Sequence, residues 1–67
     1  MTDLNTKKSV YTVNEAAAYL GLAVSTLNKW RCYGNGGPAY VKLGKAVRYR
    51  REDLDRYMRE ATVVNEF

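Results

Sequence analysis

The side chains most able to bind a ligand in this sequence are cationic, and they cluster in the middle of the chain. Residues 16–51 contain no acidic residue and carry seven Lys and Arg side chains. These are Lys29, Arg31, Lys42, Lys45, Arg48, Arg50 and Arg51. A concentrated positive field favours binding to a polyanion, because each phosphate that Lys or Arg neutralises releases condensed counterions. A solvated basic face is the alternative explanation of the same cluster.

The sequence holds little that could support catalysis or bind a metal. It has no histidine and a single cysteine, Cys32, so an internal disulfide and the usual zinc spacings are absent. The carboxylates are placed to cap or decorate helices rather than to converge on one site. We therefore expect a protein that is not an enzyme, needs no cofactor or metal, and works in a reducing, cytoplasmic compartment.

The length of 67 residues indicates one domain with a modest core. We expect a flexible N-terminal tail over residues 1–9, a folded domain over residues 10–61 and a C-terminal tail over residues 62–67. The start of the chain is polar and has no apolar run, so it is typical of neither a signal peptide nor a membrane anchor. The last tail holds Val63, Val64 and Phe67, which indicates either a protein contact or a frayed terminus.

Two short helices are predicted in the first half of the chain. Thr12 and Glu15 have the spacing of a capping box, so a helix of about two turns should begin at Val13. Gly21 should end it by adopting the left-handed conformation. After a turn of three residues, a second helix should run to about Tyr33, where a segment rich in glycine follows.

The second predicted helix has two different sides. Its apolar side consists of Val24, Leu27 and Trp30, beside the stem of Arg31. Its opposite side consists of Ser25, Asn28, Lys29 and Cys32, which recur at helical spacing and include no acid. Two short helices joined by a tight turn form a helix-turn-helix, whose second helix enters the major groove of DNA. A plain helical hairpin without a DNA-binding role has the same geometry.

A β-hairpin is predicted after the glycine-rich segment, because apolar residues alternate along two short runs. If these residues share one face, Leu43 lies opposite Val47 and Val41 lies opposite Tyr49. This register leaves residues 44–46 as a three-residue loop.

The expected register also positions the hairpin cations. A two-residue loop would place Lys42 beside Val47 and mix the two faces, so we prefer the three-residue loop. Lys42 then lies opposite Arg48, with Arg50 close by and Lys45 at the tip. Paired like charges are destabilising unless an anion lies against them, so this arrangement favours phosphate binding. A solvated strand face with splayed side chains is the alternative.

A third helix should begin at Glu52, because acidic residues in a first turn interact favourably with the helix dipole. Its apolar stripe contains Leu54, Tyr57, Met58 and Ala61. We expect this stripe to complete the core with Trp30, Val47 and Tyr49. The predicted fold is therefore a small α+β domain.

Several segments, taken together and in order, resemble a known family. They are residues 11–17, 20–22, 25–27, Trp30, residues 37–44, 47–50 and 53–54. The chain resembles the excisionase and AlpA group of MerR-like winged helix-turn-helix proteins, over roughly residues 10–60. The resemblance implies a second helix in the major groove and a hairpin, the wing, along the backbone or in the adjacent minor groove.

The resemblance also implies which residues contact DNA. Ser25, Thr26, Asn28 and Lys29 match the groove-facing part of the recognition helix. Lys42, Lys45, Arg48 and Arg50 match the wing. The chain departs from the family at Ala23, where a Ser or Thr commonly caps the second helix. The loss of that cap should cost about 1 kcal/mol of helix stability.

Small members of this group look like recombination directionality factors, or excisionases, of prophages and integrative elements. The resemblance implies a protein that binds double-stranded DNA beside an attachment site, bends it and assists a tyrosine integrase. Because one recognition helix covers few base pairs, we expect several copies to associate cooperatively on DNA. An AlpA-like transcription regulator would use the same surface. A protein-interaction adaptor or antirepressor, working through its apolar tail, is the alternative from another class.

Overall fold

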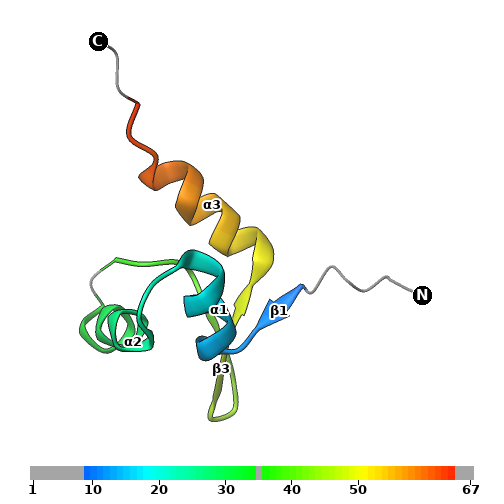
Figure 1. Ribbon diagram of the computed structural model, residues 1–67. Helices are drawn as coiled ribbons and strands as arrows, with labels where there is room; N and C mark the ends of the chain where they lie inside the picture. Colours follow the sequence, from blue (N-terminus) through cyan, green and yellow to red (C-terminus); the bar gives the residue numbers. More distant parts are fainter. Residues whose placement is uncertain (1–8, 35, 65–67) are drawn as a thin grey trace.

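The computed structural model of the chain describes residues 9–34 and 36–64 (Figure 1). In this part, three helices and a three-stranded antiparallel sheet form a small α+β domain, as predicted. The elements follow the order β1 (Val10–Tyr11), α1 (Val13–Leu20), α2 (Val24–Tyr33), β2 (Val41–Leu43), β3 (Ala46–Arg50) and α3 (Arg51–Ala61). Most of the predicted N-terminal tail, and residues 65–67 with Phe67 of the C-terminal tail, lie outside the described residues.

The first helix begins and ends where the sequence predicts. The backbone N–H of Thr12 donates to Oε1 of Glu15 at 3.0 Å, and the backbone N–H of Glu15 donates to Oγ1 of Thr12 at 3.2 Å. This reciprocal pair is the predicted capping box. Gly21 ends α1 with a φ of 72°, in the left-handed region that glycine adopts without steric cost.

The second helix runs from Val24 to Tyr33 and therefore ends where the glycine-rich segment begins. Its N-cap is Ala23, which has the extended backbone of a capping residue but makes no side-chain hydrogen bond. Gly34 closes the helix in the left-handed conformation, with its N–H donating to the carbonyl of Trp30. The departure at Ala23 has thus left the helix start in place and removed only the cap.

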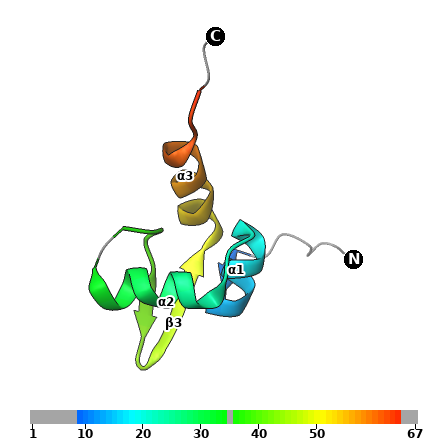
Figure 2. The same ribbon diagram turned by 60° about the vertical axis from the view of Figure 1, so that its left-hand side comes forward.

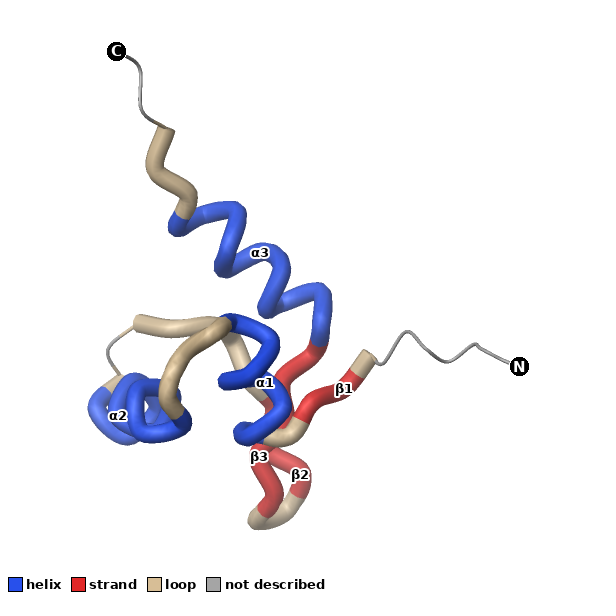
Figure 3. Tube along the Cα trace, viewed as in Figure 1, coloured by secondary structure: helices blue, strands red, loops and turns tan. Residues whose placement is uncertain are grey.

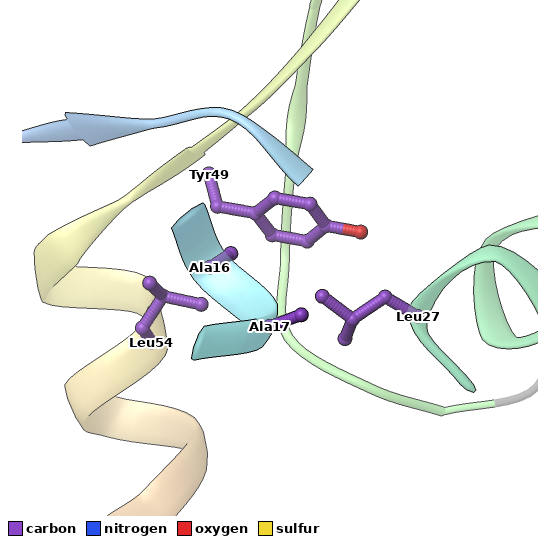
Figure 4. Packing of buried hydrophobic residues seen from close by; sticks show 5 residues of the cluster. All are labelled: Ala16, Ala17, Leu27, Tyr49 and Leu54. Atoms are coloured by element: carbon purple, nitrogen blue, oxygen red, sulfur yellow. The ribbon is translucent and has the colours of Figure 1, made fainter. Parts of the chain in front are cut away.

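The core lies where α1, α2, α3 and β3 meet (Figure 4). The small side chains of Ala16 and Ala17 on α1 allow Leu27 of α2 and Leu54 of α3 to approach from two sides. The ring of Tyr49 on β3 covers them and is 2% exposed. Partly buried Val24, Trp30 and Val47, among others, pack around this cluster, which confirms the predicted apolar side of α2.

The sheet has the order β1-β3-β2, and its first strand was absent from the sequence prediction (Figure 3). Val10 pairs with Arg50 and Tyr11 pairs with Tyr49. The backbone N–H of Arg51 also donates to the carbonyl of Ser9 at 2.9 Å. The two residues that precede the capping box therefore add a third strand to the hairpin. A strand of two residues is too short for an alternation of apolar residues to reveal it.

The predicted hairpin register is wrong. Lys42 lies opposite Val47, and Leu43 lies opposite Ala46, so the loop contains only two residues, Gly44 and Lys45. Gly44 has a φ of 65°, and no non-glycine residue in the described segments has a positive φ. A positive φ at the first loop position only is the pattern of a type II′ turn, whose twist matches that of the flanking strands. Turn geometry therefore outweighs the alternation of apolar residues.

The third helix begins at Arg51, one residue before the predicted start, and its apolar stripe contributes less to the core than expected. Leu54 is fully buried, and the ring of Tyr57 lies 5.7 Å from that of Trp30. Met58 is 39% exposed and Ala61 is exposed. The C-terminal part of α3 extends away from the other elements (Figure 1), so the prediction is wrong for these last two residues.

The start of α3 also contains a buried carboxylate that the sequence analysis treated as a helix-end charge. The side chain of Asp53 is 2% exposed, and its Oδ2 accepts a hydrogen bond from Nε of Arg50 at 2.9 Å. Its Oδ1 lies 3.6 Å from Nη1 of Arg56. Asp53 therefore ties the end of β3 to α3.

Candidate nucleic-acid interface

The polar stripe of α2 forms one face of the molecule, as predicted. Ser25, Asn28, Lys29 and Cys32, together with Tyr33, line a shallow hollow of about 260 Å³. Asn28 is half-buried, whereas the others are exposed. Thr26, the remaining predicted contact of this helix, does not line the hollow and is half-buried. The helix therefore presents short polar groups and one cation along a surface that other elements leave open.

The hairpin cations lie on two different faces, because of the corrected register. Lys42 shares a face with Val47, since residues opposite each other in an antiparallel pair point to the same side. Arg48 points to the other side with Val41, and its Nη1 donates to the carbonyl of Val47 at 2.8 Å. Lys45 is exposed in the turn. Lys42 and Arg48 therefore do not lie opposite each other, and the hairpin lacks the pair of like charges that was expected to favour phosphate binding.

The inner face of the hairpin and the end of α2 enclose a second hollow, of about 280 Å³. It is lined by Arg31, Cys32, Tyr40, Lys42, Lys45 and Val47. Figure 2 shows α2 crossing in front of the hairpin, so the two predicted DNA-contacting elements lie side by side. The structure thus joins the polar stripe of α2 to two of the wing cations.

Arg31 holds these two elements together. Its Nη2 donates to Oδ1 of Asn28 at 2.9 Å, and its Nη1 donates to the hydroxyl of Tyr49 at 3.4 Å. Its guanidinium carbon lies 6.0 Å from the centre of the Tyr40 ring, within reach of a cation–π contact. All three partners are neutral, so the positive charge of Arg31 is oriented without being cancelled.

Neither Arg31 nor Tyr40 was predicted from the sequence to contact DNA. The available signal was the i, i+3 spacing of Asn28 and Arg31, which lets their side chains meet on a helix. Tyr40 carries no comparable signal, because the expected register placed it on the outer face of the hairpin, whereas its ring lies 6.1 Å from that of Tyr49.

Arg50 is not brought together with the other wing cations. It lies where β3 pairs with β1, and its guanidinium contacts Asp53 at 2.9 Å and Glu52 at 3.6 Å. The hydrogen bond to Asp53, and then the charges of Asp53 and Glu52, raise the pKa of Arg50 above its ordinary value. Its charge is therefore permanent but is compensated locally.

Charge is divided between the two ends of the domain. The ion pairs in which both partners are described residues join Arg50, Arg51 and Arg56 to acids of α3. Tyr19 of α1 also donates to Oδ1 of Asp55 at 2.6 Å, and this hydrogen bond raises the pKa of the Tyr19 hydroxyl above its ordinary value. By contrast, no carboxylate of residues 9–34 or 36–64 forms an ion pair with Lys29, Arg31, Lys42, Lys45 or Arg48. The uncompensated positive charge therefore lies on α2 and the hairpin.

The described helices are all too short, or too polar, to cross a membrane.

Comparison with known proteins agrees with this geometry. No curated protein has significant sequence similarity to the chain. A family model described as a helix-turn-helix domain matches residues 10–62, which span β1, all three helices and the hairpin. The chain belongs to this family and is a helix-turn-helix DNA-binding protein.

Proposed function

We propose that this protein is an excisionase, or recombination directionality factor, of a prophage or integrative element. In this role it binds double-stranded DNA beside an attachment site, bends it and helps a tyrosine integrase to excise the element. The observation that carries the DNA-binding part is the junction of the α2 polar stripe with the hairpin cations, around Arg31. The recombination part rests on the resemblance to the MerR-like excisionase and AlpA group.

In the proposed complex, α2 lies in the major groove and the hairpin lies along the backbone or in the adjacent minor groove. Asn28 and Lys29 contact base edges, because an amide suits adenine and a cation suits the acceptors of guanine. Ser25 and Thr26, near the start of α2, contact bases or phosphates. Lys42, Lys45 and Arg48 contact the backbone, and Arg50 joins them only if it releases its acidic partners.

One recognition helix spans only a few base pairs, so the proposed function includes cooperative association of several copies on DNA. Val63 and Val64 follow α3 at the end away from the hairpin and are 88% and 72% exposed. Their position suits a contact with the integrase or with a neighbouring copy. The role requires binding and bending but no reaction, so we propose that the protein is not an enzyme and acts in the cytoplasm, at the nucleoid.

The test is a gel-shift titration on DNA that flanks the gene and any neighbouring attachment site, with circularly permuted probes to report bending. The proposal predicts cooperative, bent complexes at the attachment site. The matched variants are Lys29→Gln on α2 and Arg59→Gln on α3, which remove the same charge from the two ends of the domain. Only Lys29→Gln should weaken binding. A single, unbent complex at a promoter would instead indicate an AlpA-like regulator, and no complex at low salt would overturn the DNA-binding role.

A further inference from the structure

The hollow between α2 and the hairpin has a lining whose charge suits an anion. Arg31, Lys42 and Lys45 converge on it from the end of α2, from β2 and from the hairpin turn. None of its lining residues is acidic. Three cations around one hollow repel each other, and this repulsion is relieved when an anion binds among them.

Arg31 is the fixed member of this group. Asn28 and Tyr49 hold its guanidinium from two sides, at 2.9 Å and 3.4 Å, and leave it half-buried. Lys42 and Lys45 are exposed and can adjust. A planar guanidinium matches the geometry of phosphate oxygens, whereas lysines supply mobile point charges around them. The combination suits one phosphate group.

The rest of the hollow suits a sugar. Tyr40 and Val47 provide an aromatic ring and an apolar side chain beside the cations. In a duplex, one sugar–phosphate strand separates a major groove from the adjacent minor groove. If α2 occupies the first groove and the hairpin the second, that strand must pass between α2 and the hairpin, where the hollow lies.

We propose that this hollow holds one sugar–phosphate unit of the DNA backbone, with its phosphate shared by Arg31, Lys42 and Lys45. This inference rests on the proposed DNA-binding function and adds Arg31 and Tyr40 to the binding residues. The hollow fixes the position of the hairpin relative to α2 on the duplex. Arg48, on the opposite face of the hairpin, contacts a different phosphate.

Sharing of one phosphate has a measurable signature in the salt dependence of binding. The slope of log K against log salt concentration changes by about 0.9 for each phosphate that the protein neutralises. The triple variant Arg31→Gln with Lys42→Gln and Lys45→Gln removes every ligand of one phosphate, so it should lose about one unit of slope in total. Three separate phosphates would instead cost about three units. The pair Lys42→Gln with Arg48→Gln leaves Arg31 and Lys45 on the shared phosphate, so it should lose only the contribution of Arg48, about one unit.

The experiment measures binding to a mixed-sequence duplex by fluorescence anisotropy at several salt concentrations. Trp30, the only tryptophan, reports by its fluorescence whether each variant is folded. Arg31→Lys is the second variant at this position, because it keeps the charge while breaking the two-sided hydrogen bonding. It should retain most of the slope even if Arg31→Gln fails to fold.

Each outcome decides the proposal. A loss of about three units in the triple variant, or of about two units in the pair, would overturn the shared phosphate. A folded Arg31→Gln variant that binds DNA as tightly as the wild-type protein at the same salt concentration would also overturn it, because one of the three phosphate ligands would then have no effect. So would an Arg31→Lys variant that loses about one unit of slope, since this variant keeps the charge. Wild-type protein that fails to bind at low salt would refute the proposed function itself, so the two failures are distinguishable.

Discussion

Arg31 of α2 donates a hydrogen bond to the hydroxyl of Tyr49 on β3, across 3.4 Å and between residues 18 positions apart in the chain. Tyr49 is buried in the core, so its hydroxyl is a fixed point. Through the bond from Arg31 to Asn28, the polar face of α2 is linked to the strand that forms the hairpin. The surface that would contact bases and the surface that would contact the backbone are therefore held in one orientation.

We predict that Asn28→Ala relaxes the sequence preference of DNA binding. The amide can form paired hydrogen bonds with one adenine, and its loss should cost about 1–3 kcal/mol at one base position. The measurement is competition binding against a library of sites with single base changes. Asn14→Ala, an equal truncation at an exposed position of α1, is the control and should leave the preference intact. If both variants keep the wild-type preference, Asn28 does not contact bases.

Arg48→Ala should weaken binding to all DNA sequences alike. Its side chain lies on the outer face of the hairpin, where it would neutralise a phosphate rather than contact a base. The slope of log K against log salt concentration should fall by about 0.9, without a change in sequence preference. Salt titrations on specific and random duplexes measure both quantities, with Arg59→Ala as the control. Loss of discrimination between the two duplexes would contradict this division of roles.

Ala23→Ser should stabilise the protein. The backbone at Ala23 already has the extended conformation of an N-cap, with φ −75° and ψ 146°, but no side-chain oxygen accepts from the first turn of α2. A serine hydroxyl should raise the free energy of unfolding by about 1 kcal/mol. Urea denaturation measures the change. Ala18→Ser, at an exposed position inside α1, creates no cap and should give no gain.

Gly37→Ala should destabilise the protein more than Gly36→Ala does. Both glycines have positive φ, 85° and 94°, so both substitutions carry backbone strain. Only at Gly37 would the new Cβ meet the Trp30 side chain, at 2.6 Å from Cε3. Such overlap in a packed site costs about 1–3 kcal/mol. Thermal unfolding followed by Trp30 fluorescence compares the two variants, and equal melting temperatures would show that the overlap is relieved without cost.

The sequence predicted the helix-turn-helix well because its signals are local. The capping box at Thr12, the left-handed Gly21 and the helix end near Tyr33 depend only on neighbouring residues, and the structure has all of them. The hairpin register depends instead on whether the face of β2 that carries Leu43 is buried. It is not, since Leu43 is 62% exposed, and a glycine at the first loop position decides the turn.

The candidate site was predicted only in part, because some of its contacts are local and others depend on tertiary packing. Helical spacing placed Ser25, Asn28 and Lys29 on one face without knowledge of the tertiary fold. The bond between Arg31 and Tyr49, and the capture of Arg50 by Asp53, join residues through packing. Arg50 and Asp53 are three residues apart across the junction of β3 and α3. This spacing alone does not indicate that the Asp53 carboxylate is buried.

The central claim is that α2 and the hairpin form one DNA-binding surface, and a nuclear magnetic resonance titration tests it most directly. In a 67-residue protein, the backbone amides can be followed individually while duplex DNA is added at low salt. We predict that the amides of α2 and of the hairpin shift together, and that those in the last turns of α3 do not. Shifts confined to α3 and the residues after it, or no shifts at all, would contradict the account.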